Sequence, residues 1–263
     1  MYDLGWRCEQ ARLQALEELF DPASRYVIER LGIAEGWRCL EAGFGAGSMA
    51  VWLADRVGPT GRVLATDLDP RMLDNEPRAN LEVRRHDLVV DHLPRDEFDL
   101  VHSRAVLAHI PERQSALARL RDAVRPGGWL FVEDIDLAGP AMHAAAERYV
   151  WPPETRPAYR AGVQALEAVL SDADRDPGFG ALLPAAVRDC GLLDFGAEVH
   201  APIITGGAER DCMRLTLEYL HDRLLATRLI DETGLDQFLQ LTRDGGVLYI
   251  PLFMVSAWGR RPA

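Results

Sequence analysis

A glycine-rich turn with an acid before it is the part of this sequence best suited to chemistry. The turn contains Gly43, Gly45 and Gly47, and Glu41 stands two residues before the first glycine. Glycines in such a turn allow positive φ angles and let the backbone approach a ligand closely. Ser48 occupies the position at which a dinucleotide-binding turn has its third glycine. The acid fits poorly beside a diphosphate, so the turn favours a ligand that carries an ammonium or sulfonium group.

Two further acids follow later apolar runs. Asp67, in ATDLDP, lies 20 residues after Gly47, where a carboxylate can accept hydrogen bonds from two ribose hydroxyls. Asp87, in RRHDL, could accept from an adenine amino group while Leu88 offers its backbone amide. Asp67 could instead cap the next short helix, although Asp69 fills that role better, and Asp87 could be an ordinary loop acid. Together the acids indicate an adenosine site without a pyrophosphate.

An alternation of short apolar runs with helical patterns must position these residues. The expected strands are residues 38–41, 63–66, 81–84, 98–102 and 129–133. The helices expected between them are residues 48–56, 70–73 and 112–124. This alternation predicts a parallel sheet that is covered by helices on both faces.

Helical patterns also dominate two later segments, residues 136–176 and 208–243. A helix at 180–190 and strands within 195–205 and 247–259 complete the pattern. Because open α/β sheets bind ligands at the carboxyl ends of their strands, we expect the two helical segments to form a substrate lid. Pro251 predicts an edge position or a bulge for the last strand.

The chain is interpreted as a single domain, residues 1–263, whose cofactor-binding half is 35–135. Residues 1–34 are expected to form two helices, and the second should begin at Asp21-Pro22, which resembles a cap and a first-turn proline.

The composition excludes several classes of protein. A net charge of −12 argues against nucleic acid binding, because phosphates require clustered cations. All 29 residues counted as lysine or arginine are arginine, which excludes lysine Schiff-base chemistry and a Walker-type lysine. The apolar runs are too short to span a bilayer, and the first residues lack the apolar core of an export signal. The four cysteines lie far apart, as expected of free thiols. We therefore expect a cytoplasmic protein without nucleic acid or membrane partners.

Five segments, in order, resemble the motifs of class I S-adenosylmethionine-dependent methyltransferases: LEAGFGAG, ATDLDP, RHDL, FDLVHSRAVLAHIP and RPGGWLFVED. The resemblance covers roughly residues 37–135 and is closest to bacterial small-molecule methyltransferases. It implies an α/β fold with a Rossmann-like, seven-stranded, mostly parallel sheet. The last strand would be antiparallel, helices would cover both faces, and helical insertions would follow strands 5 and 6. S-adenosyl-L-methionine is the implied cofactor.

The resemblance assigns the glycine turn and Glu41 to the methionine part of the cofactor. Ser103 and Arg104 would close over the same part. In this family the first helices often fold over the cofactor, which adds weaker candidates: Tyr2, Trp6, Gln10 and Arg12.

The resemblance places the nucleoside of the cofactor on the next two motifs. Asp67 would bind the ribose, and Leu68 and Met72 would lie beside the adenine. Asp87 and Leu88 would bind the adenine edge.

Methyl transfer is an in-line displacement at a sulfonium carbon, for which the protein must align the acceptor and, for a hydroxyl or amine, accept a proton. His109, just beyond the fourth strand, is the first candidate base, although it could instead cap or pack against the loop. His143, after the fifth strand, is the second candidate.

Aromatic side chains of the first insertion could line an aromatic acceptor pocket, or they could belong to the core: Tyr149, Trp151 and Tyr159. Tyr219 and His221 of the second insertion are weaker candidates. The acids of residues 133–136 have no evident Asp-Asn partner for a divalent cation, so we predict no metal.

The leading hypothesis is methyl transfer to O, N or C of a small, aromatic or polyketide-like metabolite. An alternative is a relative that binds the same cofactor and catalyses a cyclisation, decarboxylation or hydroxylation in natural-product biosynthesis. An NAD-dependent dehydrogenase is disfavoured by Glu41 and the missing third glycine, and the long insertions favour an enclosed chamber over a non-catalytic sensor.

The sequence HSRAVL stands where enzymes that methylate nucleic acid amino groups carry Asn/Asp-Pro-Pro-Tyr, which argues against a nucleic acid substrate. The insertions could also form a homodimer interface.

Overall fold

A seven-stranded sheet forms the centre of the molecule. The computed structural model describes residues 9–73, 78–171, 175–205 and 209–263. The strand order is β3-β2-β1-β4-β5-β7-β6, and β7 runs antiparallel to both of its neighbours. The strands are β1 (Arg38–Ala42), β2 (Arg62–Asp67), β3 (Leu81–Arg85), β4 (Phe98–Arg104), β5 (Val124–Asp136), β6 (Leu193–His200) and β7 (Phe253–Arg260). The order and the antiparallel β7 confirm the expected fold class.

Helices cover both faces of the sheet because its buried strands present apolar side chains to both sides. On one face, Cys39 packs with residues of α1 (Glu9–Arg30) and α2 (Ser48–Val57). On the other face, Leu40 packs with residues of α3 (Arg113–Ala123) and α6 (Phe179–Asp189).

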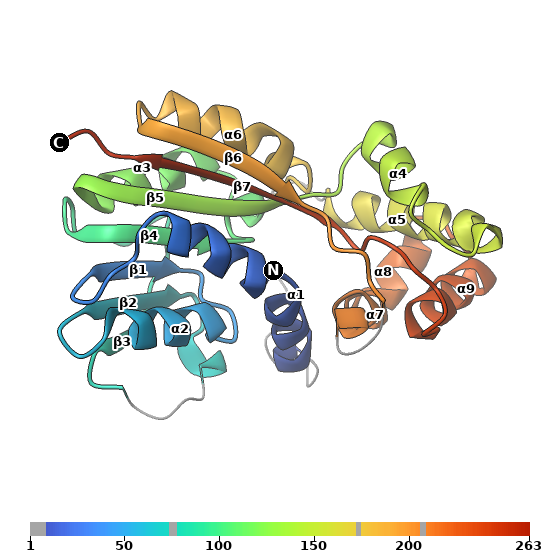
Figure 1. Cartoon of the computed structure of the whole chain (residues 1–263). Coiled ribbons are helices and arrows are strands. Elements are labelled where there is room, and N and C mark those ends of the chain that lie inside the picture. Colours follow the sequence, from blue (N-terminus) through green and yellow to red (C-terminus); the bar gives the residue numbers. More distant parts are fainter. Residues whose placement is uncertain (1–8, 74–77, 172–174, 206–208) are drawn as a thin grey trace.

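Five more helices form a cap beyond the carboxyl end of β5 (Figure 1). They are α4 (Pro140–Glu147), α5 (Arg156–Leu170), α7 (Glu209–Tyr219), α8 (His221–Ala226) and α9 (Glu232–Arg243). The cap has its own apolar core, to which Phe20 of α1 also contributes. We call these five helices the helical cap. They arise from the two segments in which helical insertions were expected.

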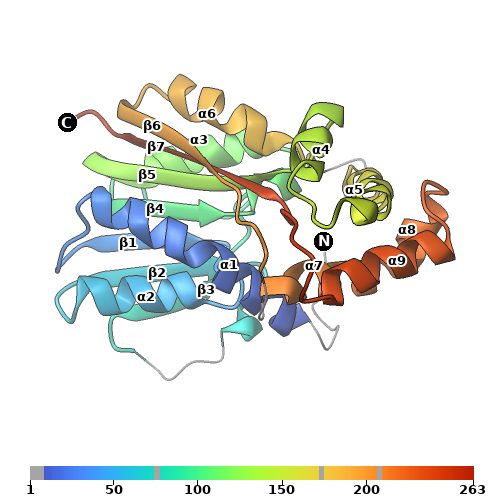
Figure 2. The ribbon, with the colours of Figure 1, turned by 45° about the vertical axis from the view of Figure 1, so that its right-hand side comes forward.

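Helix α1 is continuous, so the expected break at Asp21-Pro22 is wrong. Pro22 lies inside the helix. The Asp21 carboxylate does not cap a new helix, because it accepts hydrogen bonds from Arg25 and Arg104. The amino-terminal part of α1 lies beside α7, which joins two segments far apart in the sequence (Figure 2).

Strand β7 lies between β5 and β6, so the expected edge position is wrong. Pro251 precedes the first residue of β7, Phe253, and therefore breaks none of the hydrogen bonds of the ladder. Three short 3₁₀ helices, η1 (Pro70–Met72), η2 (Leu107–His109) and η3 (Pro153–Thr155), connect other elements.

Candidate active site

The turn after β1 has a backbone that requires glycine. Gly43, Gly45 and Gly47 have φ angles of 79°, 61° and 100°, all in the left-handed region. A side chain at Gly43 would collide with Val106, and one at Gly47 with Leu73. The turn is therefore fixed by both its conformation and its close neighbours.

A cavity of about 470 Å³ opens at this turn and extends under the helical cap. Most of the residues predicted to bind the cofactor line it: Glu41, Gly43, Gly45, Asp67, Leu68, Met72, Asp87, Leu88 and Arg104. The other two lie just outside it. The Gly47 amide donates to Glu17, and the Ser103 hydroxyl donates to the Ala42 carbonyl at 2.8 Å.

Asp67 is held at the mouth of the turn by backbone amides. Its carboxylate accepts from the amides of Gly45 at 3.3 Å and Asp69 at 3.1 Å. Burial raises the pKa of Asp67 despite these hydrogen bonds. Asp69 caps η1 through the Arg71 amide, as expected. Asp87 accepts from the Val89 amide at 2.8 Å.

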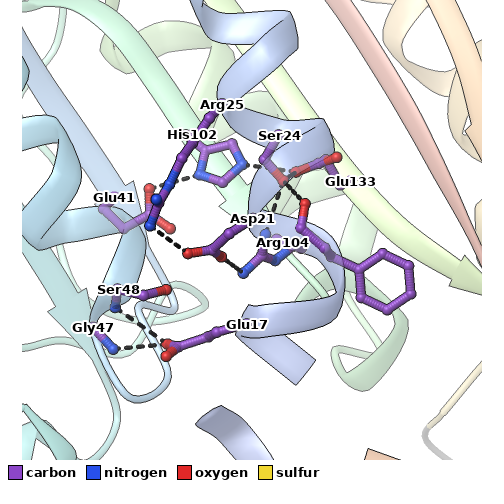
Figure 3. Close-up of polar contacts among 11 residues, drawn as sticks. Glu17, Asp21, Ser24, Arg25, Glu41, Gly47, Ser48, His102, Arg104 and Glu133 are labelled. Carbon is purple, nitrogen blue, oxygen red and sulfur yellow. Dashed lines mark hydrogen bonds and ion pairs between the residues drawn. The ribbon is translucent and has the colours of Figure 1, made fainter. Parts of the chain in front are cut away.

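Glu41 belongs to a buried chain of charges that the sequence did not reveal (Figure 3). Its carboxylate lies 2.6 Å from Nδ1 of His102, and Nε2 of His102 lies 3.1 Å from Glu133. Burial lowers the pKa of His102, but the attraction of the two carboxylates outweighs it and raises that pKa to about 9. His102 is therefore an imidazolium between two carboxylates at neutral pH. One side of Glu41 is committed to this contact rather than to a ligand.

Helix α1 completes this chain of charges. Ser24 donates to Glu133 at 2.5 Å and accepts from Arg104 at 2.8 Å. Arg104 also binds Asp21 at 2.7 Å, with both side chains 7% exposed. Burial disfavours the guanidinium, yet Glu133 and then Asp21 outweigh that effect and raise the pKa of Arg104. Arg104 thus ties α1 to β4 at the edge of the cavity.

Glu17 of α1 reaches the glycine turn itself (Figure 3). Its carboxylate accepts from the amides of Gly47 at 2.9 Å and Ser48 at 3.3 Å, at the first turn of α2. Negative charge is favoured at the amino terminus of a helix. Burial nevertheless raises the pKa of Glu17.

His109 lies at the end of η2 and lines the cavity. Burial, and then the nearby charge of Arg12, lower its pKa to about 4. The imidazole is therefore neutral at pH 7 and able to accept a proton. The buried carboxylate of Asp134 accepts from the Ala108 amide at 2.8 Å and so fixes η2 against the end of β5.

The second candidate base, His143, is not among the residues that line the cavity. Its Nε2 lies 2.9 Å from the Leu137 carbonyl and 3.2 Å from Glu167. The side chain is buried beside α5 and serves the packing of α4.

The three aromatic side chains expected to line an acceptor pocket are also outside the cavity. Tyr149 and Trp151 are 52% and 58% exposed. Tyr159 is buried in the core of the cap, where its hydroxyl donates to the Ile250 carbonyl at 2.6 Å. Helical spacing did not distinguish the buried face of α5 from a cavity wall.

Aliphatic side chains line the cap end of the cavity instead: Leu137, Leu166, Leu170, Met213 and Leu252. Of the weaker candidates, Arg12 lines it beside Glu9, whereas Gln10, Tyr219 and His221 do not. Tyr2 and Trp6 lie outside the described residues.

The acids after β5 do not converge on one point. Glu133 binds Ser24 and Ser256, Asp134 binds the Ala108 amide, and Asp136 accepts from the Ala138 amide at 3.4 Å. Within the described ranges, no group of three or more metal-binding side chains could hold an ion.

Residues 40–132 match the model of a methyltransferase domain family. The chain is 28% identical over 192 residues to Methyltransferase str3 of Strobilurus tenacellus, an alignment that covers 73% of this chain and 64% of that relative. The chain thus spans less than two thirds of the relative's length.

Solved structures share the fold. Phosphoethanolamine N-methyltransferase 2 of Haemonchus contortus, solved with phosphomonomethylethanolamine and S-adenosylhomocysteine, has a TM-score of 0.57 and 16% identity over 95% of this chain and 57% of that chain. The [4+2]-cyclase SpnF has a TM-score of 0.51 and 16% identity over 92% of this chain and 81% of that chain. None of the helices in the described residues is long and apolar enough to cross a membrane.

Residues 40–132 match a methyltransferase domain family, and the sheet order and the glycine turn with its acids agree with the resemblance to class I S-adenosylmethionine-dependent methyltransferases. S-adenosylmethionine is the cofactor of this class, as expected from the sequence.

Proposed function

We propose that this protein transfers the methyl group of S-adenosylmethionine to a small, largely apolar metabolite. One observation carries this proposal: a single cavity joins the glycine turn and its acids to an aliphatic chamber under the helical cap, with neutral His109 in the wall. A cavity of about 470 Å³ lies within the usual range of ligand sites, about 300–1,000 Å³. The helical cap would act as the substrate lid.

The residues that line the turn fit the cofactor. The left-handed turn would let its backbone approach the methionine part, and Asp67 would accept from the ribose hydroxyls. Asp87 and Leu88 would bind the adenine edge, with Leu68 and Met72 against its ring. Glu41, bound to His102, would present the remaining side of its carboxylate toward the cationic end of the cofactor.

In the proposed reaction His109 would accept the proton of the acceptor oxygen or nitrogen. The cofactor, when bound, would supply its methyl group to that atom, and the electron pair of the broken carbon–sulfur bond would stay on sulfur. Alignment of the two reactants can supply about 7–11 kcal/mol, and a positioned base about 10²–10⁴-fold in rate. An acceptor carbon would use the same alignment.

We expect His109→Gln to lower kcat by about 10²–10⁴-fold, with the affinity for S-adenosylhomocysteine unchanged, because the base would touch the acceptor and not the cofactor. His92→Gln, an exposed substitution on the surface loop after β3, is the matched control. Unchanged turnover in His109→Gln would reduce that residue to a structural role.

The alternative is a reaction without methyl transfer, such as a cyclisation, decarboxylation or hydroxylation. The fold shared with the [4+2]-cyclase SpnF leaves this alternative open, because a fold alone does not fix the chemistry.

Mass spectrometry with a cofactor that carries a trideuterated methyl group distinguishes the two reactions. A panel of hydroxylated aromatic and polyketide-like compounds is incubated with protein and cofactor. A labelled methyl group in a product, together with S-adenosylhomocysteine, supports methyl transfer. A product without the labelled methyl group supports the alternative. The same holds for a product that needs the cofactor but does not consume it.

The thiols fit the expected reducing compartment. Cys39 and Cys212 are free and buried, and burial raises the pKa of each. The further proposals are a cytoplasmic location and a homodimer formed through the helical cap.

A further inference from the structure

We propose that the acceptor carries an anionic group, a carboxylate or a phosphate, and that Arg175 binds it under the helical cap. The inference rests on the proposed function, because it takes the bound molecule to be the methyl acceptor. Binding of an anion at Arg175 can nevertheless be tested without any turnover.

The charged side chains that line the cavity are unevenly distributed along the chain. All of its acidic side chains come from α1 and from residues 41–87: Glu9, Glu17, Glu41, Asp67, Asp69 and Asp87. After β5 the described lining residues are mostly apolar, and Arg175 is the one charged side chain among them. A cofactor with a cationic sulfonium suits the acids at 41, 67 and 87, and Arg175 adds a cation to the apolar part of the lining.

Two acids of the lining bind other basic side chains, and no ion pair within the described part of the chain joins any of the six to Arg175. Glu9 forms a two-point ion pair with Arg12, and Glu41 binds His102. Arg175 makes no hydrogen bond or ion pair with another described residue. Burial, followed by repulsion from the nearby Arg223, lowers the pKa of Arg175, and a smaller attraction from Tyr219 opposes this shift. A half-buried guanidinium next to another cation is a site that an anion would stabilise.

The backbone holds the segment of Arg175 against the segment that carries the proposed base. The Asp176 amide donates to the Ala108 carbonyl at 2.9 Å, and Ala108 immediately precedes His109. The Leu137 amide donates to the Pro177 carbonyl at 2.8 Å, which holds the same segment against the end of β5. Arg175 and His109 therefore lie on two segments bonded to each other, within reach of one small molecule.

The apolar residues between them describe the rest of the ligand. Leu137, Leu166 and Leu170 are each no more than 6% exposed and line the same end as Arg175. The geometry thus fits a compact apolar skeleton with its nucleophile toward His109 and its anionic group toward Arg175. Because the whole chain carries a net charge of −12, a local cation is needed to hold such a ligand.

The test compares benzoate, phenyl phosphate and benzamide as probes that share one apolar body and differ in charge. Their dissociation constants are measured by ligand-observed NMR, with and without saturating S-adenosylhomocysteine. We expect at least one anionic probe to bind about tenfold or more tightly than benzamide, as charge-assisted hydrogen bonds would give. Preference for benzoate or for phenyl phosphate identifies the anion as a carboxylate or a phosphate.

Variants assign the preference to one side chain. Arg175→Gln should remove it, Arg175→Lys should keep part of it, and Arg148→Gln, an exposed arginine outside the cavity, should leave it unchanged. Circular dichroism and the melting temperature check that each variant is folded.

Three outcomes would overturn the inference: no binding of either anion to wild type, equal binding of benzamide, or a preference that survives in folded Arg175→Gln. Titration of S-adenosylhomocysteine on the same sample separates the two proposals. Cofactor binding without anion preference removes only the anion site, whereas anion preference without cofactor binding removes the proposed function.

Discussion

His102 and His109 are seven positions apart, yet their surroundings move their pKa values in opposite directions. His102, fully buried in β4, has carboxylates on both sides, whereas His109 lies at the cavity wall near Arg12. The first is therefore held as a cation and the second as a neutral imidazole. Their sequence neighbourhoods do not distinguish them, because the deciding partners come from other elements.

The low pKa of His109 predicts the pH dependence of the reaction. The neutral form accepts the proton, and a pKa of about 4 keeps that form populated at neutral pH. We expect kcat/KM to fall only below ~pH 5. Arg12→Gln removes a charge that lowers this pKa, so the acid limb should move toward higher pH. A pH–rate profile of both proteins measures this, and a wild-type limb near 6.5 would contradict it.

His102 makes a prediction about stability. His102→Gln leaves Glu41 and Glu133 buried without their shared cation, and breaking such a buried pair costs about 3–5 kcal/mol of unfolding free energy. Denaturant unfolding of the variant, against His92→Gln as the exposed control, measures the loss. A difference below about 1 kcal/mol would show that the three side chains are not coupled as described.

The same residue gives wild type a pH dependence. Folding raises the pKa of His102 from 6.5 to about 9, so its contribution is fully present below pH 6.5 and is lost as the pH rises through 9. The lowered pKa of Glu133 acts in the opposite direction, and its contribution is lost as the pH falls into the acid range.

At the scale of elements, α1 is the part of the structure that joins the sheet to the site. It carries Glu17 to the glycine turn and Asp21 to Arg104, while Phe20 enters the core of the cap. The expected bounds of the strands differ from the observed ones by only a few residues at most strand ends, because short apolar runs between turns are local signals. The continuity of α1 could not be predicted in the same way, because the contacts of Asp21 depend on the end of β4.

Asp21→Ala tests this role of α1. The substitution removes the ion pair of buried Arg104 and leaves it Glu133 and Ser24, so we expect a loss of about 1–3 kcal/mol of unfolding free energy together with faster amide exchange along α1. Glu18→Ala, on the exposed side of the same helix, is the control. Equal stability and exchange in the two variants would mean that α1 is held by its apolar contacts alone.

At the scale of the whole molecule, the cavity is assembled from segments that no sequence spacing relates. The acids at 41, 67 and 87 could be predicted, because the carboxyl ends of parallel strands meet at one edge of the sheet. The pairing of His102 with Glu41 and Glu133, and the backbone bond that joins the segment of Arg175 to that of His109, depend on packing between distant segments. The aromatic residues of the cap were misplaced for the same reason, since periodicity marks a buried face without saying what buries it.

Calorimetric titration of wild type and Asp67→Ala with S-adenosylhomocysteine tests the central claim most directly. Asp67→Ala should bind at least about tenfold more weakly, because it loses a carboxylate that would accept from the ribose, and Asp222→Ala, an exposed acid of the cap, should bind like wild type. Wild type that binds no cofactor, or Asp67→Ala that binds as well as wild type, would contradict the account of this cavity as the cofactor site.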